Sequence, residues 1–341
     1  MKKKIFTLIL SLLTAVSLCA CGDENSQTSA ETSKTDAIIS LGDYHNLTTT
    51  VERTEPSEEE VESWAEYFYN QDAAEMDWNK TAELGDTVII DFIGTLNGIA
   101  FDGGTASDYS LTLGTHTFIE GFEEGLVGIN AGESRDLNLT FPENYGNADL
   151  AGKETVFNVT CKKVIPHMTE ENVACIQSDL YSNLDELKEI TRKNLISEKE
   201  IEYKDNVLAD VLNQILENTE FGPIPVSDVA STQYQLNQVY SQYAEVYGMD
   251  AETFAQQIFG HTLKEEAENT VKLDLIIKKI AELEGLTVSD AELKKGAEEF
   301  VEQTYGDAMT ADEFLEANGE DMFREYILQN KVHDLLLSNL K

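Results

Sequence analysis

The sequence has few basic residues, few prolines and few cysteines, and each shortage excludes a class of protein. Only 24 of the 341 residues are Lys or Arg, against 64 Asp or Glu, so the formal net charge is −40. Because nucleic acids require a basic protein face, this balance excludes most roles on DNA or RNA. Five prolines exclude a collagen-like chain, while an apolar content of 41% predicts a folded chain with a buried core.

Cysteine and histidine are too scattered to predict a metal site. Two of the four cysteines lie near the N-terminus, and none belongs to a CxxC motif or a His/Cys cluster. Cys161 alternates with Phe157 and Val159, which predicts a small buried residue. A disulfide between Cys161 and Cys175 stays open as an alternative if the chain is exported.

The first 21 residues have the composition of an export signal. Three lysines at positions 2–4 precede an apolar stretch over residues 5–16, which is too short to span a bilayer comfortably. The run LCAC at residues 18–21 resembles the lipobox of bacterial lipoproteins. That resemblance implies that residues 1–20 are removed and that the thiol of Cys21 carries a diacylglycerol. An ordinary signal peptide with incidental cysteines is the alternative.

The lipobox resemblance predicts a protein tethered by lipid to the outer face of the cell membrane. Residues 22–36 are polar and rich in Ser and Thr, so we assign residues 21–40 to a flexible linker. Removal of residues 1–20 takes away three lysines and no acids, which leaves a net charge of −43. Because so acidic a surface gains nothing from anionic headgroups, a covalent lipid is the expected tether.

After the linker, the pattern changes from helical to β-like and back. A capping box at Ser57 and Glu60 opens a helix before the β-rich block. Its apolar stripe is expected to pack on the later helices and consists of Val61, Trp64, Ala65 and Phe68. After the block, one helix is predicted around residues 184–190 and a second over residues 207–216, and capping boxes at residues 289–292 and 310–313 open two more.

The β-rich block lies between about residues 84 and 164. Apolar residues alternate at residues 88–92, 137–141 and 157–161, and Asn97-Gly98 is a hairpin turn signal. A short helix is predicted over residues 120–128. The predicted fold class is therefore α+β: a small antiparallel sheet wrapped on a short helix at residues 81–165, inserted between a helical arm at 41–80 and a large helical domain at 166–341.

Four separated motifs in the β-rich block point to one family. They are Phe101-Asp102-Gly103-Gly104, Leu113-Gly114, IEGFEEGL at residues 119–126 and FPENYG at residues 141–146. In order and spacing, over about eighty residues, they resemble the FKBP-type peptidyl-prolyl isomerases.

The flanking segments extend the resemblance to the trigger factor family of chaperones. Residues 41–78 resemble the segment that enters its isomerase domain, and residues 266–293 and 318–340 resemble its helical C-terminal domain. The sequence shows no basic ribosome-docking loop, so no ribosome partner is expected. The resemblance implies an isomerase and chaperone for exported proteins, with unfolded chains containing Xaa–Pro bonds as partners. It implies no cofactor and no metal.

By the same resemblance, mostly aromatic side chains form the isomerase pocket. The catalytic set implied is Phe92, Phe101, Asp102, Phe118, Ile119, Phe122, Tyr145 and Phe157, with Tyr109 contacting substrate. The family implies that the Ile119 N–H donates to the substrate carbonyl and that Asp102 orients the rim. On pattern alone, the phenylalanines in strands and helix are equally consistent with core packing, and Asp102 with a local turn cap.

Helices around residues 230–247 carry more aromatic surface than one packed face readily hides. We expect Tyr240 and Tyr243 to contact unfolded polypeptide, because tyrosine offers a broad apolar ring with a polar tip. An ordinary amphipathic helix with tyrosines along a core boundary is the alternative. Two other functions stay open: a non-catalytic holdase, and a solute-binding lipoprotein, which should show repeated strand–helix alternation after residue 166.

Overall fold

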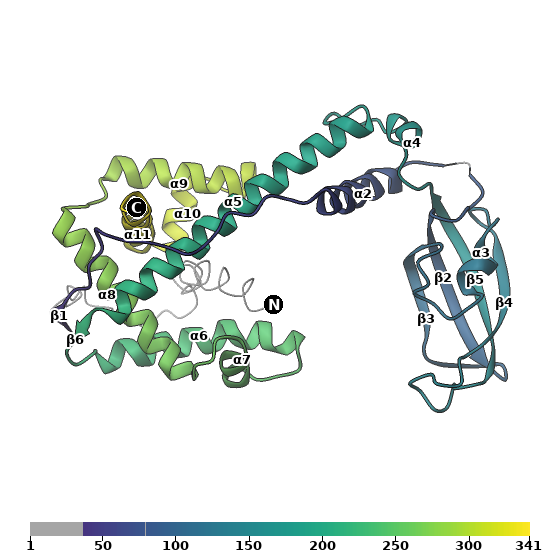
Figure 1. Ribbon diagram of the computed structural model, residues 1–341, viewed down its shortest axis with the longest axis horizontal. Coiled ribbons are helices and arrows are strands. Elements are labelled where there is room, and N and C mark those ends of the chain that lie inside the picture. Colours follow the sequence, from purple (N-terminus) through teal and green to yellow (C-terminus); the bar gives the residue numbers. More distant parts are fainter. Residues whose placement is uncertain (1–36, 79) are drawn as a thin grey trace. The chain divides into compact units, whose positions relative to one another are not determined.

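The computed structural model describes residues 37–78 and 80–341, and these residues fall into two compact units. One unit is the continuous segment Glu55–Glu198, and the other combines residues 37–54 with Lys199–Lys341 (Figure 1). The predicted signal segment, most of the predicted linker and Cys21 lie outside the described residues. We describe each unit by itself and call them the isomerase unit and the helical unit.

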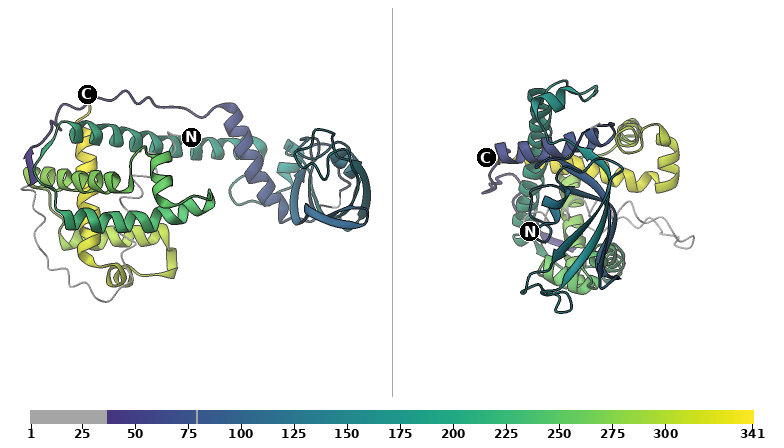
Figure 2. Two further views of the ribbon diagram at one scale, coloured as in Figure 1. Left: turned by 90° about the horizontal axis from the view of Figure 1, so that it is seen from below. Right: turned by 90° about the vertical axis from the view of Figure 1, so that its right-hand side faces the viewer.

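A four-stranded antiparallel sheet forms the centre of the isomerase unit. Its strands are β2 (Thr87–Leu96), β3 (Ile99–Thr112), β4 (Ser134–Thr140) and β5 (Glu154–Ile165), in the order β3-β2-β5-β4. The sheet curves beside the short helix α3 (Phe122–Leu126), as Figures 1 and 2 show. The predicted turn at Asn97-Gly98 joins β2 to β3, and the φ angles of these two residues are 52° and 79°, as a two-residue hairpin turn requires.

The alternating residues predicted from the sequence face one core. Val88, Ile90 and Phe92 of β2 are buried together with Phe122 and Leu126 of α3. A helix of five residues cannot be stable in isolation, so α3 depends on this packing. The predicted α+β fold class is confirmed.

The carboxylate of Asp86 joins the entry and the exit of the sheet. It is fully buried, accepts hydrogen bonds from the backbone N–H groups of Glu83 (2.8 Å) and His167 (3.0 Å), and pairs with Lys80 at 3.0 Å. Burial alone raises the pKa of Asp86, but these hydrogen bonds and that from the His167 ring hold the pKa below its ordinary value. Because residue 83 precedes β2 and residue 167 follows β5, one side chain fixes both ends of the segment.

Helix α2 (Glu58–Ala74) packs on α4 (Glu170–Ala174) and on the start of α5 (Leu184–Glu217). The predicted capping box at Ser57 is present. The buried stripe, however, is Val61, Ala65, Tyr69 and Ala73, while Trp64 and Phe68 are exposed. Successive residues on a helix are about 100° apart, so the i, i+4 stripe through Ala65 and Tyr69 turns the preceding residue of each pair away from the core.

The helical unit contains the remaining elements. They are the two-stranded sheet of β1 (Ile38–Ser40) and β6 (Glu220–Phe221), with α6 (Val226–Val246), α7 (Ala251–Ile258), α8 (Leu263–Glu284), α9 (Asp290–Thr304), η2 (Gly306–Ala308), α10 (Ala311–Asn318) and α11 (Glu320–Ser338). The capping boxes at Ser289 and Thr310 are confirmed. Residues 38–40, assigned to the linker from sequence, pair with β6 because Ile38 packs into the helical core.

The two helices predicted at residues 184–190 and 207–216 are one continuous helix, α5. The prediction of a break between them is wrong, because residues 191–206 contain neither Gly nor Pro to interrupt the hydrogen-bond ladder. Residues of this helix contribute to the core of both units.

Two further findings concern the chain as far as it is described. No helix among residues 37–78 and 80–341 is both long and apolar enough to span a membrane. Cys161 is buried and Cys175 is exposed, and both are free thiols, so the alternative of a disulfide between them is not found. The prediction of Cys161 as a small core residue is confirmed.

Candidate functional site

Phe92 lies at the centre of a group of aromatic rings in the isomerase unit. Its ring centroid is 5.6 Å from that of Phe118, 5.8 Å from Phe122, 5.9 Å from Tyr109 and 6.2 Å from Phe157. The first three pairs meet edge to face, which is a favourable geometry for aromatic rings. Residues of β2, β3, α3 and β5, and of the loop before α3, thus converge to form one wall.

Phe101 begins a second wall that meets the first at Phe157. The Phe101 ring lies 5.8 Å from Phe157 and 5.9 Å from Phe141, and Phe141 lies 4.6 Å from Tyr145. Glycine makes room for the Phe101 ring, because a Cβ atom at Gly94 would lie 2.7 Å from it. Phe141 was not predicted as a site residue, although it begins the FPENYG motif. We call these eight rings the aromatic cluster.

Exposure increases from the inside of the aromatic cluster to its edge. Phe92, Phe122 and Phe157 are buried, Phe101 and Phe118 are half-buried, and Tyr109 and Tyr145 are 40% and 43% exposed. The inner rings are therefore core residues, as the sequence pattern allowed, and they also back the accessible rings. The accessible rings thus form an apolar surface at the edge of the core.

A buried carboxylate holds the loop that carries Phe118. Glu123 of α3 accepts backbone N–H hydrogen bonds from Gly114 (2.8 Å), His116 (3.0 Å), Thr117 (2.8 Å) and Phe118 (3.3 Å). Burial by itself raises the pKa of Glu123, but the four N–H groups more than offset this and hold the pKa below its ordinary value. The sequence analysis missed this positioning residue, because a glutamate in a short helix is expected to be a solvent-exposed side chain.

The backbone next to this loop leaves one donor available. The carbonyl of Ile119 accepts a hydrogen bond from the Phe122 N–H at 3.1 Å. Within the described part of the chain, the Ile119 N–H itself has no acceptor. A free amide donor beside an aromatic surface can bind a carbonyl oxygen.

Asp102 is less constrained than either sequence interpretation supposed. It lies on β3, is exposed, and makes no hydrogen bond or ion pair among the described residues, so it caps no turn. Asp91 holds this region instead: it accepts from the Asp108 N–H at 2.8 Å and pairs with Lys162 at 2.8 Å. These contacts fix the backbone next to Tyr109, and the sequence carried no signal for them.

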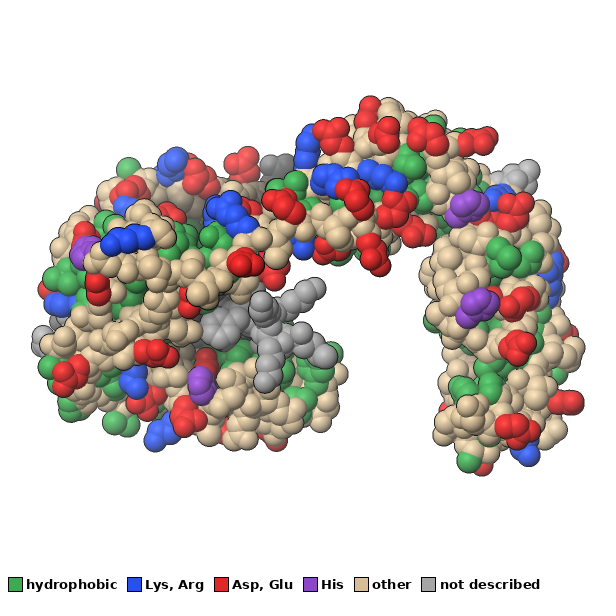
Figure 3. All heavy atoms as spheres, in the orientation of Figure 1, with side chains coloured by type: hydrophobic (Ala, Val, Ile, Leu, Met, Phe, Trp, Pro, Cys, Tyr) green, Lys and Arg blue, Asp and Glu red, His purple; other side chains and the backbone are tan. Residues whose placement is uncertain are grey.

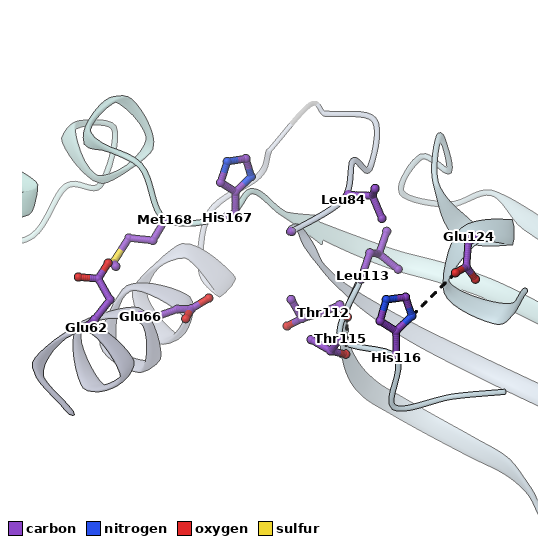
Figure 4. A pocket seen from close by; sticks show the side chains of 12 residues that line it. Glu62, Glu66, Leu84, Thr112, Leu113, Thr115, His116, Glu124, His167 and Met168 are labelled. Atoms are coloured by element: carbon purple, nitrogen blue, oxygen red, sulfur yellow. Dashed lines mark hydrogen bonds and ion pairs between the residues drawn. The ribbon is translucent and has the colours of Figure 1, made fainter. Parts of the chain in front are cut away.

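A separate cavity of about 680 Å³ lies elsewhere in the isomerase unit (Figure 4). Glu62 and Glu66 of α2 line one side, and His116 and Glu124, whose Nδ1 and Oε1 atoms are 4.0 Å apart, line another. None of the predicted site residues lines it. Among the described residues no group of three His, Cys, Asp or Glu side chains could hold a metal ion.

The two tyrosines predicted to bind polypeptide differ in the structure. Tyr240 is only 1% exposed, and its ring lies 5.6 Å from Phe254 and 5.2 Å from Phe259, so it is a core residue of the helical unit. The expectation that Tyr240 offers surface to a client is therefore corrected. Tyr243 is exposed, as are Tyr234 and Tyr247 on the same helix and at its end.

We predict that Glu123→Gln destabilises the chain at neutral pH. An amide cannot accept four N–H bonds, and leaving buried donors unpaired costs about 1–3 kcal/mol. Because the folded-state pKa of Glu123 is lowered, its contribution is complete above the ordinary pKa and is lost as the pH falls through the lowered one. Denaturant unfolding should thus show a difference from wild type at pH 7 that shrinks in acid.

The matched control is Glu124→Gln, since Glu124 is exposed and, among the described residues, accepts the Gly121 N–H at 3.1 Å and lies 4.0 Å from the His116 ring. A pH-independent loss for Glu123→Gln, or an equal loss for the control, would contradict the role assigned to the buried carboxylate.

Comparison with protein families matches two parts of the chain. Residues 79–162 match the model described as FKBP-type peptidyl-prolyl cis-trans isomerase. Residues 183–338 match the model described as the C-terminus of bacterial trigger factor protein. The first match contains every ring of the aromatic cluster, and the second contains α6 with its exposed tyrosines.

Relatives that align with most of the chain are described as trigger factors. The chain is 32% identical over 315 residues to a trigger factor of Caldicellulosiruptor bescii, with 88% of this chain and 70% of the relative covered. It is 34% identical over 313 residues to a trigger factor of Streptococcus agalactiae, with 88% and 72% covered. A solved structure of the trigger factor chaperone overlays with a TM-score of 0.42 at 21% identity and covers 87% of this chain and 71% of that chain. The chain therefore belongs to the trigger factor family and contains an FKBP-type peptidyl-prolyl isomerase domain followed by the trigger factor C-terminal domain.

Proposed function

We propose that the chain isomerises Xaa–Pro bonds at the aromatic cluster, holds unfolded polypeptide on its helical unit, and serves exported proteins at the outer face of the cell membrane. The observation that carries the catalytic part is the exposure gradient of the aromatic cluster beside the free Ile119 N–H. Family membership argues against the solute-binding alternative. It leaves the non-catalytic holdase as the competing function.

The proposed reaction needs no covalent chemistry. Rotation about a peptide bond is opposed by amide resonance, a barrier of ~18–20 kcal/mol, and Xaa–Pro bonds isomerise unaided in tens to hundreds of seconds. In the twisted transition state the amide loses its resonance, and its carbonyl loses charge separation. An apolar aromatic surface therefore binds that state better than the hydrated planar amide, which is the condition for catalysis.

Each part of the cluster has a role in this scheme. The proline ring packs on the accessible rings of Phe101, Phe118 and Tyr109, and Phe122 and the other inner rings support these from behind. The Ile119 N–H donates to a substrate carbonyl. This hydrogen bond keeps that carbonyl fixed while the C–N bond of the Xaa–Pro amide rotates. Asp102 lies at the exposed rim, where its charge faces the part of the substrate that stays in water.

We predict that Phe101→Ala lowers kcat/KM on a short Xaa–Pro peptide by about tenfold or more, equivalent to ~1.4 kcal/mol of transition-state binding. Tyr145→Phe keeps the ring and should change kcat/KM much less. Phe122→Ala removes a core ring at a cost of ~3–5 kcal/mol of stability, so its folding must be established first. Folded Phe101→Ala with full activity would place catalysis elsewhere, and a wild type inactive on peptides would favour the holdase.

The helical unit is proposed to hold unfolded chains through α6. Tyr234, Tyr243, Val246 and Tyr247 are exposed there, next to a core already filled by Tyr240. We predict that replacing Tyr234, Tyr243 and Tyr247 together by Ser weakens suppression of aggregation of an unfolded test protein by several-fold, while peptide isomerisation is unchanged. The control is Tyr305→Ser, an exposed tyrosine outside α6. Equal losses in both variants would show that α6 is not the client surface.

The site of action is proposed from the lipobox at residues 18–21. In cells, wild-type chain should enter the detergent phase with the membrane fraction, and Cys21→Ala should carry no lipid. Mass spectrometry of the mature N-terminus checks both statements. Recovery of unmodified Cys21 in the mature wild-type chain would refute the anchor without affecting the proposed catalysis.

A further inference from the structure

Helix α2 presents an aromatic surface that the fold does not use. Trp64, Tyr67 and Phe68 are 44%, 51% and 36% exposed, and we call them the α2 aromatic surface. Their ring centroids lie 5.5 Å (Trp64–Tyr67), 5.6 Å (Tyr67–Phe68) and 6.0 Å (Trp64–Phe68) apart. The three rings therefore form one continuous apolar patch on solvent.

These rings do not attach α2 to the isomerase unit. The attachment is the buried stripe through Ala65 and Tyr69, and the Tyr69 hydroxyl donates to the carbonyl of Pro166 at 3.0 Å, directly after β5. Helix α2 thus has a fixed place beside the end of the sheet (Figure 1). Packing does not explain three exposed aromatic residues on a helix that is already anchored.

Acidic residues surround the patch and favour a partner of positive charge. Helix α2 carries five glutamates, one aspartate and no basic residue. The nearest bases, on α5, are already paired: Arg192 binds Glu58 at 2.9 Å and Lys188 binds Glu62. Glu59 and Glu66 have no partner among the described residues. Figure 3 shows more Asp and Glu than Lys and Arg side chains on this face of the molecule. A second copy of this chain, with its net charge of −40, is therefore repelled, whereas a basic segment is attracted.

We propose that the α2 aromatic surface binds a basic, apolar segment of the same unfolded polypeptide whose Xaa–Pro bond occupies the aromatic cluster. Lys and Arg side chains of that segment stack on Trp64 and Tyr67 and pair with Glu59 and Glu66. Because both surfaces belong to one unit, the second contact is intramolecular and raises the effective concentration of substrate at the cluster. This inference rests on the proposed isomerase function and adds a preference for basic clients.

Trp64 itself reports on the site. The chain has two tryptophans, and the other, Trp78, is half-buried with its Nε1–H bonded to the Ala73 carbonyl at 2.8 Å. In a Trp78→Phe background, a proline-free peptide of alternating Lys and Leu should shift Trp64 emission to the blue in a saturable way. The same peptide with Glu in place of Lys should bind at least about tenfold more weakly. Salt should weaken binding of the Lys peptide.

Two variants test the rings and the charges separately. Trp64→Ala with Tyr67→Ala should lower kcat/KM for proline-limited refolding of a basic unfolded protein several-fold, and leave kcat/KM on a short Xaa–Pro peptide at the wild-type value. Glu59→Gln with Glu66→Gln keeps the rings. This variant should weaken binding of the Lys peptide and leave binding of the Glu peptide no weaker. The matched control is Leu180→Ala, an exposed apolar residue of the same unit outside α2.

An unmoved Trp64 emission, or equal binding of the two peptides, would overturn the proposal. So would refolding activity that falls no further in the ring variant than in the Leu180 control. Failure of the isomerase function is measured separately, by activity on short Xaa–Pro peptides. The Trp64 signal uses a proline-free peptide, so it tests the α2 aromatic surface whether or not the wild type has isomerase activity.

Discussion

The burial of Phe122 against Phe92 and Phe157 is the contact on which the isomerase unit depends. It attaches a five-residue helix to the sheet, and that helix brings the Glu123 carboxylate under the loop that carries Phe118. The same rings form the inner wall of the aromatic cluster. The rings that fill the core therefore also support the accessible rings of the aromatic cluster.

Much of the fold could be predicted because its signals are local. Alternation at Val88, Ile90 and Phe92, the Asn97-Gly98 turn and the capping boxes at Ser57 and Ser289 all depend on neighbours in sequence. The cluster could be predicted for a different reason: its rings lie in motifs of family-specific order. Pattern alone could not separate a buried ring from an accessible one, because Phe92 is buried and Phe101 is half-buried although both lie on strands.

The rest depends on contacts between distant residues. Glu123 and Asp91 accept hydrogen bonds from backbone N–H groups of other segments, at Thr117 and Asp108. The positions of these segments relative to the two acids cannot be predicted from the local sequence pattern. The orientation of α2 was misjudged at Trp64 because the buried stripe runs through Ala65 and Tyr69, and the local pattern does not distinguish it from the neighbouring stripe through Trp64 and Phe68. Tyr240 was predicted at the surface, yet Phe254 and Phe259 from the next turns of chain cover it.

Two segments far apart in the sequence close the helical unit. Leu47 bridges to Leu340, and the N–H of Lys341 donates to the Leu47 carbonyl at 3.1 Å, whereas the isomerase unit is one continuous segment. A chain that emerges N-terminus first can therefore complete the isomerase unit while the helical unit still lacks its last helix. The Xaa–Pro bonds at Pro223 and Pro225 then lie in the unfinished unit of a chain whose isomerase domain is already folded.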